Sequence, residues 1–189
     1  VPFGFREFYA VGEKLYLNGK EIFLQGDHVD VVTNGGFLLR NPEVAVHFMQ
    51  LARGMNIDIV RTHCQLAPDW WWDISDELGM MFEPHNHILA GYWQAVPDRN
   101  WEDPALKVYM TRYLTGFVKE YRNHPSIVMW SPTNELLIGA HSAQFYEAVR
   151  FWQDMGKIMK SIDPTRLIHH QGINGLVGVK PYPFDIADL

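Results

Sequence analysis

The chain has 189 residues, of which 47% are hydrophobic and 20% charged, a composition typical of a globular protein with a sizeable core. Its net charge of -6 disfavours nucleic acid and anionic membrane surfaces as partners. The single cysteine, Cys64, excludes a disulfide within the chain, and no apolar run approaches the roughly 20 residues that cross a bilayer.

A hairpin is the first predicted element. Asn18 and Gly19 tolerate the positive φ angles of a type I′ turn, and an apolar run stands on either side of them. We expect this hairpin to occupy residues 1–20 and to lead into a first core strand at Ile22–Gly26.

Helices and strands then alternate along the rest of the chain. Helical spacing of apolar residues, with Pro, Asn and Gly at the boundaries, predicts helices over about 41–54, 68–79, 104–124 and 142–162. Short apolar or β-branched runs predict strands at Ile57–Val60, Met80–Phe82, Ile127–Trp130, Leu167–Gln171 and Asp185–Leu189.

Repeated strand-helix units of this length are typical of a (β/α)8 barrel, which needs about 250 residues or about 31 per unit. We therefore predict an α/β fold, with residues 21–189 forming an incomplete TIM barrel of about the first five to six β/α units. A doubly wound nucleotide-binding sheet is disfavoured because no glycine-rich phosphate loop follows an early strand.

Polar residues follow each predicted strand. The active sites of TIM barrels lie at the carboxyl ends of the strands, so we expect these side chains to share one pocket. In chain order they are Asp27, His28, Asp30, Arg61, His63, Glu83, His85, Asn86, His87, Asn134, Glu135, His169, His170 and Gln171.

The most specific motif is Arg122–Glu135, which reads RNHPSIVMWSPTNE. It closely resembles the acid/base motif of glycoside hydrolase family 2, the group of β-galactosidases, β-glucuronidases and β-mannosidases. Other segments resemble the same family's barrel in the same order, namely Phe3–Arg6, Leu17–Lys20, Phe23–Gly26, Val60–Thr62 and Asp76–Gly79.

This resemblance implies a carbohydrate substrate and β-galactosidase-like, retaining hydrolysis of a β-glycosidic bond without a metal or other cofactor. It assigns the general acid/base to Glu135, a hydrogen bond with the sugar 2-hydroxyl to Asn134, and the orientation of the nucleophile to Arg61. The family's nucleophile is a glutamate on a seventh strand, and the last predicted strand here is the sixth. We therefore expect the 189 residues alone to be inactive, and expect their partner to be the rest of the parent polypeptide, with the missing barrel units and β-sandwich domains.

Further side chains are candidates for contact with the sugar. Histidine and aspartate at the strand ends can hydrogen-bond hydroxyl groups, and the apolar face of a sugar ring packs on aromatic side chains. These candidates are Asp27, His28, His63, His85, His87, His169 and Trp93, with Trp101 as a second aromatic candidate.

Two alternatives remain open from the sequence. His85 and His87 could hold a divalent metal, which would make the chain a metal-dependent hydrolase barrel. The chain could also be a noncatalytic carbohydrate-binding domain derived from a barrel.

Overall fold

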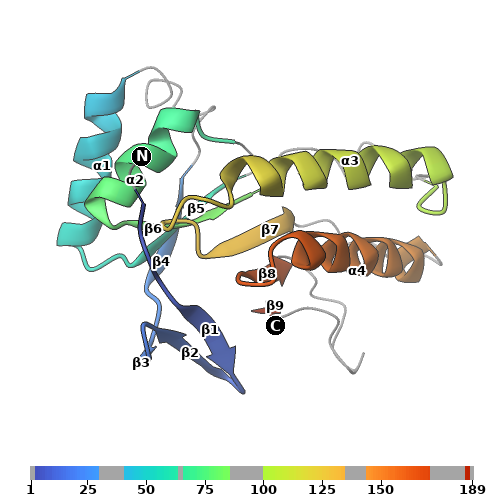
Figure 1. The fold of residues 1–189 in the computed structure, drawn as a ribbon, viewed down its shortest axis with the longest axis horizontal. Helices are drawn as coiled ribbons and strands as arrows, with labels where there is room; N and C mark the ends of the chain where they lie inside the picture. Colours follow the sequence, from blue (N-terminus) through green and yellow to red (C-terminus); the bar gives the residue numbers. More distant parts are fainter. Residues whose placement is uncertain are drawn as a thin grey trace.

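The computed structural model describes residues 3–29, 41–63, 66–85, 100–134, 144–170 and 186–187 (Figure 1). Six parallel strands form its centre: β4 (Gly26–Val29), β5 (Ile59–Thr62), β6 (Met81–Pro84), β7 (Met129–Thr133), β8 (Leu167–His170) and β9 (Ile186–Ala187). β4, β5 and β6 pair in that order, as do β7, β8 and β9, and bridges from Phe82 to Ile127 and from His85 to Ser131 join β6 to the β7 side. Spatial order therefore follows chain order, as in a TIM barrel.

In the described part of the chain, four helices lie between these strands: α1 (Pro42–Gly54), α2 (Asp69–Leu78), α3 (Pro104–Tyr121) and α4 (Gln144–Ile162). α1 lies against α2, and α3 runs beside α4 (Figure 1). Local sequence sets several of the helix boundaries. The side chains of Asn41 and Asp103 cap the first turns of α1 and α3, and Gly79 ends α2 in the left-handed conformation. No helix in the described ranges has both the length and the apolar character needed to cross a bilayer.

Alternate residues of β5, β6, β7 and β8 face two different clusters. Val60, Phe82, Trp130 and Ile168 pack with the helices in the larger hydrophobic core. The neighbouring residues, at the first positions of their strands, form a second cluster on the barrel's inner side: Ile59, Met81, Met129 and Leu167. Because strand side chains alternate between faces, β5, β6, β7 and β8 each contribute to both clusters.

A small antiparallel sheet closes the N-terminal end of the strands. It consists of β1 (Phe8–Val11), β2 (Lys14–Leu17) and β3 (Lys20–Ile22). Its apolar side chains, including buried Phe8, pack against the inner cluster. Asn18 and Gly19 have φ of 51° and 77°, so the predicted turn is confirmed.

Several predicted strand boundaries were wrong. The first core strand is Gly26–Val29, because Ile22 instead ends β3 of the small sheet. β5, β6 and β7 likewise extend two or three residues past the predicted ends, into polar sequence. Apolar character marks only the part of each strand that is enclosed by other apolar groups. Polar residues continue the same strands where they line the inside of the barrel.

The turn before β7 is held by two arginines from distant segments. Arg6 donates to the carbonyl oxygens of Pro125 and Ile127, at 3.0 and 2.6 Å. Arg166 donates to the carbonyl oxygens of Ile127 and His124, both at 2.7 Å. These bonds satisfy backbone acceptors that would otherwise be costly to bury, so they fix the start of β7.

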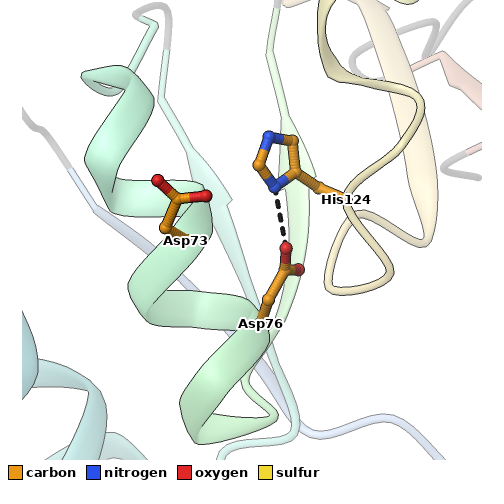
Figure 2. Close-up of side chains that lie close together, drawn as sticks. All are labelled: Asp73, Asp76 and His124. Atoms are coloured by element: carbon orange, nitrogen blue, oxygen red, sulfur yellow. Dashed lines mark hydrogen bonds and ion pairs between the residues drawn. The ribbon is translucent and has the colours of Figure 1, made fainter. Parts of the chain in front are cut away.

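Asp76 of α2 holds the same turn from the helix side. Its Oδ2 atom is 2.8 Å from His124 Nδ1 (Figure 2). Its Oδ1 atom accepts a hydrogen bond from the Ser126 backbone N–H at 2.9 Å. Asp73 lies close enough that one ligand atom from each of Asp73, Asp76 and His124 falls within 4.8 Å of the others. Both Asp76 oxygens already have protein partners, so we interpret this group as a structural link.

Replacement of Asp76 by alanine should lower the free energy of unfolding by about 1–3 kcal/mol, because it leaves the partly buried His124 and the Ser126 N–H without their acceptor. Urea unfolding followed by tryptophan fluorescence measures the change. Asp73→Ala on the same helix is the matched control and should change stability by less than about 0.5 kcal/mol. Equal losses in the two variants would contradict the structural link.

Candidate active site

Polar side chains form a row across the inside of the barrel wall, one level above the apolar inner cluster. His28 of β4 pairs with Arg61 of β5, and Arg61 pairs with Glu83 of β6, in the parallel register. The preceding inward positions of β5 and β6 are Ile59 and Met81. The change from apolar to polar thus occurs at the same level in adjacent strands, toward their carboxyl ends.

A cavity of about 420 Å³ opens at this level. Its volume lies within the range of small-molecule sites, which is about 300–1,000 Å³. β4, β5, β6 and β7 all contribute to its lining: Gly26, Asp27, His28, Ile59, Arg61, Glu83 and Met129.

Glu83 is the centre of the polar contacts. Its Oε1 atom accepts a hydrogen bond from Nδ1 of His169 at 2.8 Å and lies 3.5 Å from Nε of Arg61. The side chain of Ser131 also hydrogen-bonds the carboxylate. One buried carboxylate therefore connects β5, β6, β7 and β8.

Burial by itself would raise the pKa of Glu83, but the charge and hydrogen bond of His169, with the charge of Arg61, hold it below its ordinary value of 4.5. Glu83 is thus ionised at neutral pH. It can accept hydrogen bonds but has no proton to give to a leaving group.

Asn134 joins this network from the end of β7. Nη2 of Arg61 donates to its Oδ1 atom at 2.8 Å, and both side chains are buried. Two residues that lie 73 positions apart in the sequence are therefore in direct contact at the pocket. The sequence had assigned both to the site, and the structure brings them together.

Asp27, His28 and His63 lie at the rim of the site. The side chains of His28 and Asp27 are 63% and 61% exposed, and Nδ1 of His28 is 3.7 Å from Asp27. The rings of His28 and His63 meet edge to face, with their centroids 5.4 Å apart. Asp27 and His28 are open to solvent and His63 is partly buried, whereas Arg61, Glu83 and Asn134 are enclosed.

Two other strand-end histidines occupy different surroundings. His85 is fully buried in the pairing of β6 with the β7 side, and its backbone N–H donates to Thr62 Oγ1 at 3.0 Å. His170 is buried between β8 and α4, where a methyl group on Gly156 would lie only 3.2 Å from its Nε2 atom. Burial and the neighbouring His169 hold the pKa of His170 well below 6.5, so it is neutral.

Glu135, His87 and Trp93, three of the predicted site residues, lie outside the described residues. Trp101 is partly buried and packs on Phe151 and Trp152 against the helical core, and its role as a sugar-stacking residue stays a prediction. Glu83 was grouped with the strand-end polar residues but given no role. Its position directly after the apolar run Met80–Phe82 was the available signal.

Comparison with known proteins identifies the family. Residues 10–184 match the model of the family described as "Glycosyl hydrolases family 2, TIM barrel domain". The chain belongs to glycoside hydrolase family 2. This assignment confirms the predicted fold class, and the parallel β4–β9 arrangement is an incomplete form of that barrel.

Curated relatives of this family 2 chain include β-galactosidases. That of Halalkalibacterium halodurans is 28% identical over 178 residues, which cover 90% of this chain and 16% of the relative. The β-galactosidase of Lactococcus lactis is 26% identical, over 89% of this chain and 16% of the relative. The 189 residues therefore span only about a sixth of the length of these relatives.

Solved structures show the same fold. The β-galacturonidase of Eisenbergiella tayi bound to galacturonate has a TM-score of 0.71 and 23% identity, over 89% of this chain and 28% of that one. β-glucuronidase 3 of Bacteroides uniformis has a TM-score of 0.71 and 22% identity, over 89% of this chain and 21% of that one. At these identities the likeness supports the arrangement of the barrel.

Glu83→Gln should lower the free energy of unfolding by about 3 kcal/mol near neutral pH, because buried Arg61 loses its carboxylate. The folded-state pKa of Glu83 lies below 4.5, so its stabilisation is complete above that pH and is lost as pH falls through the folded pKa. The difference between wild type and Glu83→Gln should therefore shrink on acidification, as measured by urea unfolding at a series of pH values. Glu120→Gln, at an exposed site on α3, is the control with little effect at any pH. A difference for Glu83→Gln that does not vary with pH would contradict this account.

Proposed function

We propose that this chain supplies the acid/base side of the active site of a retaining β-glycosidase. The observation that carries the proposal is the hydrogen bond from Arg61 to Asn134. It holds the residue that precedes Glu135 at the carboxyl end of β7, beside the polar row of β4, β5 and β6. Catalytic groups of TIM barrels come from this end of the strands.

In the proposed reaction, Glu135 protonates the glycosidic oxygen as the bond to the leaving group breaks. Asn134 binds the sugar 2-hydroxyl, a contact that strengthens as the transition state gains oxocarbenium character. A second carboxylate, about 5 Å from the first, attacks the anomeric carbon and forms a glycosyl-enzyme intermediate. Glu135 then removes a proton from the water that releases the sugar.

We do not assign the nucleophile to Glu83, because its carboxylate is already engaged by Arg61 and His169. We place the nucleophile outside the 189 residues, on a further strand of the parent polypeptide. The remaining barrel units and β-sandwich domains of that polypeptide are then the partners that complete the enzyme. The short span of this chain relative to its relatives supports that view.

The substrate proposed first is a β-galactoside, since the curated relatives named above are β-galactosidases. Arg61 would help to hold the nucleophile, and Asp27, His28 and His63 would contact sugar hydroxyls at the rim. The metal-dependent alternative depends on His85 and His87, and the complete burial of His85 argues against it.

The full-length protein should hydrolyse a β-galactoside, and Glu135→Gln should reduce kcat/KM by about 10²–10⁴-fold on a substrate with an alkyl leaving group. The loss should be much smaller for a dinitrophenyl glycoside, whose leaving group departs without a proton. Steady-state kinetics on the two substrates make this measurement, and proton NMR of the first-formed sugar tests for retention.

Equal losses on both substrates would count against Glu135 as the acid. Sugar binding without hydrolysis in the full-length protein, unchanged by Glu135→Ala and Asn134→Ala, would favour a noncatalytic domain. The 189 residues expressed alone should show no turnover.

A further inference from the structure

The buried charge of Glu83 is stabilised by residues that belong to the candidate active site. It is 4% exposed and ionised, and an isolated carboxylate in such a place would be strongly destabilising. Arg61 and His169 approach it from β5 and β8, and Ser131 hydrogen-bonds it from β7. Loss of this carboxylate would therefore disturb three neighbouring strands at the level of the pocket.

The contacts continue from Glu83 toward the reacting groups. Nε of Arg61 lies 3.5 Å from the Glu83 carboxylate, while Nη2 of the same guanidinium donates to Asn134 at 2.8 Å. A guanidinium is planar and rigid, so fixing one edge of Arg61 also fixes the direction of the other. Asn134 is in turn joined to Glu135 by a peptide bond.

The geometry points to Glu83 as a positioning residue, which orients the Asn134 amide through Arg61 so that the sugar 2-hydroxyl is bound correctly in the transition state. This inference rests on the proposed glycosidase function. It assigns no proton transfer and no covalent step to Glu83. A misplacement of about 1 Å in such a group can reduce a rate by about 10²-fold.

A second buried ion pair provides a matched control. Oδ2 of Asp163 lies 2.6 Å from Nη1 of Arg166 and accepts from Trp130 Nε1 at 3.0 Å. Asp163 and Glu83 are both 4% exposed carboxylates paired with an arginine. The Asp163 pair, however, holds the turn before β7, at the opposite end of the strand from Asn134.

The test compares Glu83→Gln with Asp163→Asn in the full-length protein, by steady-state hydrolysis of an alkyl β-galactoside. Both variants should lower the midpoint temperature of unfolding. At an assay temperature at which both variants are folded, only Glu83→Gln should lower kcat. We expect a loss of about 10²-fold with KM little changed, because the lost interaction is made in the transition state. A normal kcat for Glu83→Gln, or equal losses in the two variants, would overturn the inference.

A double-mutant cycle tests the route through Asn134. If Glu83 acts by orienting Asn134, Glu83→Gln combined with Asn134→Ala should lose no more activity than Asn134→Ala alone. Additive losses would show that Glu83 acts independently of Asn134, and would overturn the inference.

Arg61→Lys covers the case in which Glu83→Gln does not fold. Lysine keeps a positive charge beside Glu83 but lacks the second edge that reaches Asn134. Arg61→Lys should reproduce the loss of kcat and the non-additivity with Asn134→Ala, and an unchanged kcat would overturn the inference.

Wild-type protein that hydrolyses no glycoside would reject the proposed function and this inference together. Activity that depends on Glu135 but not on Glu83 or Arg61 would reject the inference alone.

Discussion

The polar side of this barrel depends on the contacts of one buried carboxylate, that of Glu83. Strands that lie side by side in a parallel sheet need no side-chain contact to pair, but polar groups enclosed between them must find partners. Glu83 supplies that partner to Arg61 and His169 at the same time. Opposite charges meet in this cluster, and removal of one partner would leave the other as an uncompensated buried charge.

The opposite end of the strands is organised by hydrogen bonds to backbone. Arg6 and Arg166 donate to the carbonyl oxygens of the turn before β7, and Asp76 holds His124 and the Ser126 N–H in the same turn. The first part of the family motif therefore has a structural role at the N-terminal end of β7. Farther along the motif, Met129 lines the pocket and Asn134 accepts a hydrogen bond from Arg61.

The described residues thus form two layers inside the barrel with different purposes. Apolar side chains at the first positions of the strands pack on the small β1–β3 sheet and close the floor. Charged and polar side chains two positions later line the cavity of about 420 Å³ above it. This order places the electrostatic groups of the site on a rigid base and keeps solvent away from one side of them.

The sequence alone determined the barrel, the Asn18–Gly19 turn and the presence of Arg61 and Asn134 at one site, because strand-helix alternation and family motifs are local patterns. Tertiary structure decided which polar residues meet. Adjacent His169 and His170 look equivalent in the sequence, yet strand alternation turns His169 toward Glu83 and His170 toward α4. The importance of Glu83 was equally hidden, since its partners lie on other strands and only the fold brings Arg61 within ion-pair distance and His169 within hydrogen-bonding distance.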